Sequence, residues 1–424
     1  MKNFKESGIE WLGEIPEHWE VVKINKIVTF VNGYAFENFD FNPIFEIPVI
    51  RIGDMQKEKI LYDNCLKTKE KEKLKQFLIS NNDILIALSG ATTGKIAFCD
   101  TDNKAYINQR VAIVRSKLKL VKYYFLTRGF SLLIELACNG SAQPNISTKE
   151  IGEFKIPLPP LKEQEQIANF LDEKCKKIAN FIEKKEKLIT LLKEQKQALI
   201  NETITKGLDK NINFKDSGIE WLGEIPQHWK LVRLGLILKT SSGTTPDSGN
   251  DKYYKGGQIV WINSGDLNDG FLKDSKRKIT QDALDDYSVL KIFDKDSLIV
   301  AMYGATIGKT AILKVNACVN QACCVLEKSA WYNTFYLFYL FNRYKKELIS
   351  MGSGGGQPNI SQDIIKNIKI PLPPLKEQEQ IANFLDEKCK KIDLLIEKTE
   401  KQIKLTKEYK ITLTNQAVCG RINL

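Results

Sequence analysis

Two long stretches of the chain carry apolar residues at alternating intervals of four and three positions. They cover about residues 160–205 and 374–419, and most of their other positions are Lys, Glu or Gln. After the opening proline neither stretch contains Gly or Pro, so each predicts one continuous helix of about 45 residues, roughly 70 Å long. The apolar seam of these helices consists of Leu171, Cys175, Ile178 and Ile182 in the first stretch and Leu385, Cys389, Ile392 and Ile396 in the second.

A helix with so narrow an apolar seam buries little surface when it stands alone. The two helices are therefore expected to pack against each other as a coiled coil. The alternative is that each helix packs separately on its own domain.

The rest of the chain shows a different pattern, with short apolar runs separated by Gly, Asn, Asp and Ser. Such runs are typical of strands, and they occur at 83–88, 95–98, 111–114, 258–262 and 297–301. Helical spacing returns near 120–136 and 332–350. Each half of the chain therefore predicts a mixed α/β (α+β) globular domain that is followed by a long helix.

The sequence is one unit written twice. Residues 3–19 return with few changes at 213–229, and residues 155–178 return unchanged at 369–392. Three shorter motifs recur in the same order: Gly90–Lys95 with Gly304–Lys309, Asn108-Gln109 with Asn320-Gln321, and Gln143–Ser147 with Gln357–Ser361. Two copies of one unit can be related by a pseudo-twofold axis, which would give the protein a pseudo-twofold internal repeat.

The repeats also predict the domain boundaries. We expect a first globular domain at 1–156, a first long helix at 157–208, a second globular domain at 209–370 and a second long helix at 371–424. The middles of the two copies, about 21–140 and 231–356, share little beyond the short motifs. Common ends with unlike middles indicate a shared scaffold that carries two different surfaces.

Composition narrows the function. Lys and Arg number 63 against 52 Asp and Glu, which gives a formal net charge of +11 and permits attraction to nucleic-acid phosphates. The chain has nine Cys without a CxxC pair and only two His, His18 and His228, at matching positions beside a Trp. Serine-protease-like triads, Cys-His pairs and most zinc sites are therefore excluded, no metal site is expected, and no catalytic residue is predicted. The beginning of the chain lacks the apolar region of a signal peptide, so a cytoplasmic protein is expected.

The doubled Gly-Lys motif allows three interpretations. Gly90–Lys95 and Gly304–Lys309 resemble part of a phosphate-binding loop, but Ser89 and Tyr303 stand where that loop requires its first glycine. The favoured interpretation is a strand-turn-strand in which glycines permit the tight bend. A lysine that meets a nucleic-acid phosphate is the third possibility.

Loops that read DNA need polar side chains that reach base edges, together with cations that approach phosphates. Such loops occur in the parts of the two halves that differ and at the short doubled motifs. The candidate DNA-binding residues are Asn32, Tyr34, Arg51, Asp54, Lys95, Asn108, Gln109, Arg110, Gln143 and Asn145 in the first half and Ser242, Thr244, Thr245, Tyr253, Asn263, Asp266, Lys309, Asn320, Gln321, Gln357 and Asn359 in the second.

Taken together, the chain resembles the specificity subunit of type I restriction-modification enzymes. The likeness is carried by the paired SGIEWLGEIPxHW segments, the paired QPNIS turns and the paired IPLPPLKEQEQIANFLDEK helix starts. These motifs span the whole chain in the order variable domain, constant helix, variable domain, constant helix.

The resemblance implies a fold and a function. Each variable domain would be a target recognition domain for one half of a bipartite, asymmetric site in double-stranded DNA. The two helices would form an antiparallel coiled coil that fixes the spacing of the half-sites. Two modification (methyltransferase) subunits would dock on the constant regions, and restriction (endonuclease and translocase) subunits would join them. The chain itself would be non-catalytic and would bind no cofactor, because S-adenosylmethionine, ATP and magnesium belong to the partner subunits.

Two other functions stay open at this point. One is a nucleotide-dependent enzyme that uses the Gly-Lys turns, and the other is a structural coiled-coil adaptor without sequence-selective DNA binding.

Overall fold

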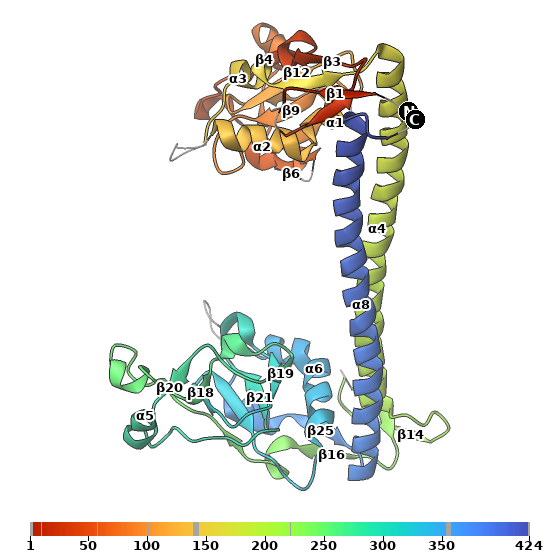
Figure 1. Ribbon diagram of the computed structural model, residues 1–424. Coiled ribbons are helices and arrows are strands. Elements are labelled where there is room, and N and C mark those ends of the chain that lie inside the picture. The colour runs from red at the N-terminus through yellow and green to blue at the C-terminus, as the bar shows by residue number, and fades with distance from the viewer. Residues whose placement is uncertain are drawn as a thin grey trace. The chain divides into compact units, whose positions relative to one another are not determined.

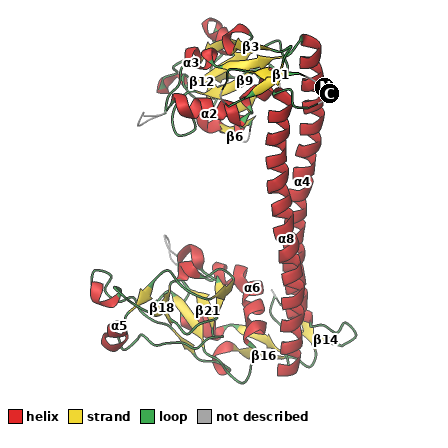
Figure 2. Ribbon diagram, in the orientation of Figure 1, coloured by secondary structure: helices red, strands yellow, loops and turns green. Residues whose placement is uncertain are grey.

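A computed structural model describes residues 3–9, 11–56, 58–99, 102–138, 144–220, 222–352 and 358–422. The chain forms two compact units, Met1–Glu186 with Glu400–Leu424, and Lys187–Thr399. Each unit combines a domain of mixed strands and helices with a part of both long helices (Figures 1 and 2). Among the described residues no helix is both long and apolar enough to cross a membrane.

Unit 1 is built around a four-stranded antiparallel sheet with the order β10 (Ile96–Phe98), β9 (Ile84–Ala87), β12 (Val111–Arg115) and β4 (Thr29–Asn32). Every residue of β9 is buried, as the continuous apolar run predicts for a central strand. The smaller sheets are β1 (Phe4–Glu6) with β2 (Glu14–Pro16), β3 (Glu20–Lys23) with β13 (Lys155–Leu158), β11 (Tyr106–Ile107) with β5 (Ile47–Ile50) and β8 (Leu66–Thr68), and β6 (Met55–Gln56) with β7 (Lys59–Ile60).

Unit 2 repeats this plan with a five-stranded sheet, ordered β17 (Thr240–Ser241), β24 (Cys323–Leu326), β21 (Leu298–Ala301), β22 (Thr310–Leu313) and β19 (Gly270–Leu272). Strands β24, β21 and β22 correspond to β12, β9 and β10, and β19 adds a parallel strand at the edge. The smaller sheets are β14 (Phe214–Asp216) with β15 (Glu224–Pro226), β16 (Lys230–Arg233) with β25 (Lys369–Leu372), and β20 (Lys278–Ile279) with β18 (Ile259–Ile262) and β23 (Cys318–Val319).

The short helices differ between the units, with one exception. Unit 1 has α1 (Val121–Phe125), α2 (Arg128–Ala137) and α3 (Thr148–Glu153), and unit 2 has α5 (Gln281–Asp286), α6 (Thr334–Ser350) and α7 (Gln362–Asn367). Of these, α3 and α7 are equivalent and are capped by matching serines, Ser147 and Ser361. The helical stretch expected near 120–136 is divided between α1 and α2. Thr127 causes the break, because its hydroxyl donates to the carbonyl of Tyr124 and accepts the N–H of Phe130 as the N-cap of α2.

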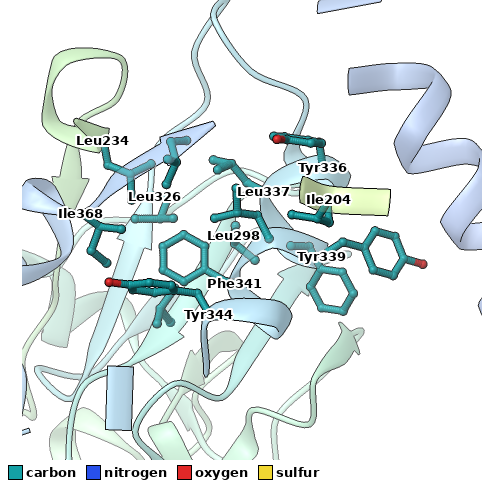
Figure 3. Close-up of a cluster of buried hydrophobic side chains, with 14 of the residues drawn as sticks. Ile204, Leu234, Leu298, Leu326, Tyr336, Leu337, Tyr339, Phe341, Tyr344 and Ile368 are labelled. Atoms are coloured by element: carbon teal, nitrogen blue, oxygen red, sulfur yellow. The ribbon is translucent and has the colours of Figure 1, made fainter. Parts of the chain in front are cut away.

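The core of unit 2 lies between the sheet and α6. Figure 3 shows aromatic side chains of α6, including Tyr336 and Phe341, beside Leu298 and Leu326 from the central strands. Ile204 from the first long helix belongs to the same cluster. The globular domain and the helix therefore share one hydrophobic core, which fixes the domain on the helix.

The long helices are α4 (Leu161–Lys206) and α8 (Leu375–Val418), which confirms both predicted helices. In unit 1, Leu171 and Ile178 near the start of α4 share a core with Leu413 and Val418 near the end of α8. In unit 2 the end of α4 meets the start of α8, where Ile204 shares a core with Leu385. The two helices therefore pack antiparallel within each unit.

The predicted seam faces inward along both helices. Its buried members are Leu171, Ile178, Leu385, Cys389 and Ile392, and its half-buried members are Cys175, Ile182 and Ile396. Ion pairs flank the seam, with Lys196 2.7 Å from Asp393 and Lys407 4.0 Å from Glu186. A narrow seam with charged edges is the pattern that coiled coils require.

The doubled amino-terminal segment anchors each domain to the start of a long helix. Trp19 is 1% exposed, and its indole N–H donates to Glu163 Oε2 at 3.0 Å, while His18 Nε2 lies 2.6 Å from Glu163 Oε1. Unit 2 repeats the arrangement with Trp229 and His228 around Glu377, at 3.0 and 2.9 Å. Both histidines thus take part in packing contacts at the helix starts.

A second doubled contact joins the proline-rich hinge to the domain. The buried hydroxyl of Tyr124 donates to the carbonyl of Pro157, and that of Tyr336 donates to the carbonyl of Pro371 at 2.9 Å. Burial raises the pKa of both tyrosines well above the usual range, so both remain neutral donors.

Replacing either tyrosine by phenylalanine should lower the free energy of unfolding by about 1–3 kcal/mol, because a buried carbonyl loses its partner. Urea unfolding of Tyr124→Phe and Tyr336→Phe measures this. The control is Tyr409→Phe on α8, whose side chain is exposed and which should change stability by less than about 0.5 kcal/mol. Equal stability of all three variants would contradict the assigned role of the hinge contact.

Candidate nucleic-acid interface

The three short doubled motifs meet at one edge of unit 1. The turn that contains Gly90 is hydrogen-bonded to the turn at Pro144, since the Gly90 N–H donates to the carbonyl of Pro144 at 2.9 Å. The N–H of Leu88 donates to the carbonyl of Arg110, and the N–H of Ile146 donates to the carbonyl of Leu88, each at 2.9 Å. Segments that are far apart in the sequence thus form one surface at the end of β9.

The same surface occurs in unit 2. Gly304 N–H donates to the carbonyl of Pro358 at 2.8 Å. The N–H of Met302 donates to the carbonyl of Ala322, and the N–H of Ile360 donates to the carbonyl of Met302, each at 2.9 Å. We call this surface, formed by the Gly-Lys turn, the Asn-Gln turn and the Pro-Asn-Ile-Ser turn, the motif edge of each unit.

The Gly-Lys turns are strand-turn-strand connections. The N–H of Gly94 donates to the carbonyl of Ala87 at 2.8 Å, and β9 and β10 are antiparallel neighbours on either side of the turn. Gly308 and Ala301 repeat this bond at 3.0 Å in unit 2. A phosphate-binding loop leads from a strand into a helix instead, so the geometry of both turns disfavours the nucleotide-binding interpretation.

The motif edge of unit 1 is hollowed by a cleft of about 930 Å³. Four of the candidate DNA-binding residues line it: Asn32, Gln109, Arg110 and Asn145. All four side chains are exposed. They come from two loops and the end of β4, and together they offer one guanidinium and three amides, which are the groups that read base edges in DNA.

Two matched glycines allow the chain to cross this edge. A Cβ atom on Gly33 would lie 2.1 Å from the carbonyl oxygen of Asn108, and one on Gly243 would lie 1.8 Å from that of Val319. Only glycine fits where the chain leaves β4 or β17 and passes the Asn-Gln turn. This close crossing places Asn32 and Ser242 beside the turn.

Some candidate residues make internal contacts instead. Asp54 is 3% exposed, accepts the N–H of Arg51 at 2.9 Å and forms an ion pair with its guanidinium at 3.1 Å. Asn263 and Asp266 repeat this turn, with the N–H of Asn263 2.9 Å from Asp266 Oδ2. Tyr34 packs against Phe36 and Phe77 with ring centroids 5.0 and 5.5 Å apart. These contacts stabilise the conformation of the loops that carry the candidate residues.

In unit 2 the polar candidates form a connected network. Thr245 donates to Gln321 Oε1 at 2.7 Å, and Ser242 donates to the carbonyl of Gln321 at 3.3 Å. The amide of Asn320 donates to Asn263 Oδ1 at 3.2 Å. The carbonyl of Thr244 accepts the indole N–H of Trp261 at 3.2 Å. The network holds Gln321 in place while its side chain stays exposed.

Tyr253 lies in a separate group. Its hydroxyl and the ammonium of Lys252 both donate to Asp286 Oδ2, at 3.2 and 2.7 Å. Desolvation and the contact with Asp286 raise the pKa of Tyr253, and the bonds from Lys252 and Tyr253 lower the pKa of Asp286. At neutral pH the group is therefore an ion pair with a neutral tyrosine.

The remaining candidates divide into three sets. Asn359 is exposed on the motif edge of unit 2, and Asn108 is half-buried in its turn. Lys95 and Lys309 are half-buried at the ends of the Gly-Lys turns, and Lys95 does not line the cleft of unit 1. Gln143 and Gln357 lie outside the described residues.

Two residues on the motif edges, Ser89 and Tyr303, are not among the DNA-binding candidates predicted from the sequence. Ser89 and Tyr303 precede the Gly-Lys turns at matching positions and pair with Asn145 and Asn359, and Tyr303 is 46% exposed. The signal that identifies them is their difference directly before a motif that the two copies share except at Thr93 and Ile307. No group of three His, Cys, Asp or Glu side chains that could hold a metal occurs among the described residues, and all nine cysteines are free thiols.

Comparison with known proteins places this architecture in a family. Residues 16–202 and 226–405 each match the family model of the type I restriction modification DNA specificity domain. Over its full length the chain is 27% identical to the MjaVIII specificity subunit of a type I restriction enzyme from Methanocaldococcus jannaschii, and the match covers 96% of that subunit. It is 24% identical to the EcoBI specificity subunit of Escherichia coli, over 91% of this chain and 82% of that one.

Solved structures share the fold. A chain from a study of complex assembly and conformational transition of the type I R-M system superposes with a TM-score of 0.73 at 16% identity, covering 96% of this chain and 99% of that chain. The HsdS subunit from Thermoanaerobacter tengcongensis gives 0.55 at 16% identity, covering 96% and 98%. Because two copies of the family model cover most of its length, the chain belongs to the family of type I restriction modification DNA specificity domain proteins.

Proposed function

We propose that this chain is the DNA-specificity subunit of a type I restriction-modification enzyme and that each globular domain reads one half of a bipartite DNA target. The observation that carries this function is the doubled motif edge. Two domains with largely unlike sequences present the same three turns in the same hydrogen-bonded arrangement. Two domains that read different DNA sequences would need this combination, in which three shared turns are surrounded by different side chains.

The chemistry of the motif edges supports contact with DNA. Exposed amides on both edges, together with Arg110 in unit 1, can form paired hydrogen bonds with base edges. The net charge of +11 favours association with phosphates without specifying a sequence. The difference between the two half-sites would then come from the unlike residues, such as Asn32 and Arg110, and the shared turns would also set the register on the backbone.

The doubled helix starts support two identical partners. Residues 155–178 and 369–392 have the same sequence, so each unit offers the same surface where its long helix begins. In this proposal two modification subunits dock there, and restriction subunits complete the endonuclease. Methylation and cleavage are carried out by the partners in the cytoplasm, and S-adenosylmethionine, ATP and magnesium are bound by them rather than by this chain.

The function is tested by mapping methylated adenines across the genome in cells with and without this gene. We expect one bipartite motif to lose its methylation when the gene is removed. Unchanged methylation at every motif, in cells that contain active modification subunits, would overturn the function and favour a structural adaptor.

Arg110 provides a residue-level prediction. Arg110→Ala should weaken binding of the assembled complex to its target by about 1–3 kcal/mol and relax discrimination within one half-site only. Titration with the target and with half-site variants measures both effects. The matched control is Arg128→Ala, which removes an arginine paired with Glu135 at 2.6 Å on α2, away from the cleft, and should leave both properties unchanged.

A further inference from the structure

Each unit contains a cleft where the globular domain meets the helix pair. In unit 1 it has a volume of about 620 Å³ and lies between α1, α4 and α8. In unit 2 it has a volume of about 570 Å³ and lies between α6, α8 and α4. We call these two sites the joint clefts. They occur at equivalent places, although the surrounding domains differ in sequence.

The joint clefts share walls from both long helices. Asp172 and Cys175 line the first cleft, and their repeat equivalents Asp386 and Cys389 line the second. The opposing helix contributes Lys410 to the first cleft and Lys196, its equivalent 214 positions earlier, to the second. Many neighbours of these lysines differ between the two copies. The aspartate, the cysteine and the lysine on the helix side of the cleft are therefore the same in both units.

Both joint clefts have an apolar floor. In the first it includes Ile84, Phe98 and Leu126, and in the second it includes Phe335 and Phe338 of α6. Leu126 and Phe338 follow the hinge-binding tyrosines, Tyr124 and Tyr336, at the same distance in sequence. An occupant must therefore carry apolar side chains to replace water on this floor.

Each joint cleft also carries four lysines and has excess positive charge. In the first cleft, Lys122 and Tyr123 contact Asp172, and Lys410 lies 3.2 Å from Glu58. In the second cleft, Lys345, Lys390 and Lys196 pair with Asp269, Asp386 and Asp393.

The lysines left over are Lys117 and Lys119 in the first cleft and Lys193 in the second. All three are exposed, and within the described part of the chain no ion pair engages them. An occupant with carboxylates would complement this charge.

We propose that the joint clefts are twin docking sites, each of which receives an acidic, apolar segment of one modification subunit. The inference rests on the proposed function and adds the place and the chemistry of the contact. Two clefts of similar volume, with the same residues on the walls that the long helices form, fit two copies of one partner. Their apolar floors favour a protein segment over the phosphate backbone of DNA, and they lie at the helix pair rather than at the motif edges.

The test reverses the charge of the free lysines. The variants are Lys117→Glu with Lys119→Glu in the first cleft, Lys193→Glu in the second, and all three together. Native mass spectrometry and titration of the full chain with the modification subunit of the same system measure how many subunits bind and how tightly. Controls with equal charge change are Lys26→Glu with Lys73→Glu, and Lys255→Glu, at exposed positions that line neither cleft.

We expect the unchanged chain and the controls to bind two subunits. Each single-cleft variant should hold one subunit at full affinity and the second at least tenfold more weakly, and the combined variant should lose both. Unchanged melting temperatures would show that the variants are folded. Two subunits bound tightly by every variant would overturn the docking sites, as would a loss of DNA affinity with both subunits retained. If the unchanged chain binds neither subunit nor DNA, the proposed function itself fails.

Discussion

Replacing Trp19 by alanine is expected to lower the free energy of unfolding of unit 1 by about 3–5 kcal/mol. The side chain is 1% exposed, packs among Leu12, Ile15 and Cys419, and donates its only N–H to Glu163. Truncation leaves a cavity and also removes a donor from a partly buried carboxylate. Trp229 is fully buried and donates to Glu377, so Trp229→Ala should lower the free energy of unfolding of unit 2 by the same amount.

Hydrogen exchange can assign each loss to its unit, because local stability is measured amide by amide. Trp19→Ala should raise exchange in Met1–Glu186 and Glu400–Leu424, and Trp229→Ala should raise it in Lys187–Thr399. Trp331→Ala is the control, since that side chain is 64% exposed and should cost less than about 0.5 kcal/mol. If Trp19→Ala or Trp229→Ala lowered the free energy of unfolding by no more than Trp331→Ala does, the doubled segment would not anchor its domain.

Lengthening both long helices by four residues is expected to increase the spacer between the two DNA half-sites by one to two base pairs. Each inserted turn adds about 6 Å to a helix, and each base pair adds about 3.4 Å to DNA. Insertions after Glu186 in α4 and after Thr399 in α8 fall where the chain passes between the compact units. Both helices are continuous across these points.

The spacer is measured by mapping methylation in cells that carry the lengthened chain. Both half-site sequences should be unchanged. An insertion in α4 alone serves as the control, because it shifts one helix against the other and should abolish recognition. A spacer that stays the same after the double insertion would contradict the role of the helices in spacing.

The helices and the central strands followed directly from the sequence because their signals are local. An uninterrupted 4-3-4 seam predicts α4 and α8, and continuous apolar runs predict β9, β12 and β21. The break between α1 and α2 has a weaker signal, since Thr127 ends one helix and caps the next through its own hydroxyl. A threonine inside an apolar helical pattern is a marginal cue unless its hydrogen bonds are known.

The motif edge is a long-range property. Gly90 and Pro144 are bonded across more than fifty positions, and nothing in either motif alone specifies that pairing. The recurrence of all three motifs in the same order indicated that they matter, but their meeting required the sheet. Arg51 and Asp54 show the opposite case, because their separation of three positions is the local signature of a capped turn.

A domain exchange tests whether each domain reads its own half of the target. Residues 21–140 are replaced by the equivalent segment of another specificity subunit, and methylated adenines are mapped across the genome. We expect one half of the bipartite motif to change while the other half is retained. A change in both halves, or in neither, would contradict the assignment of one half-site to each domain.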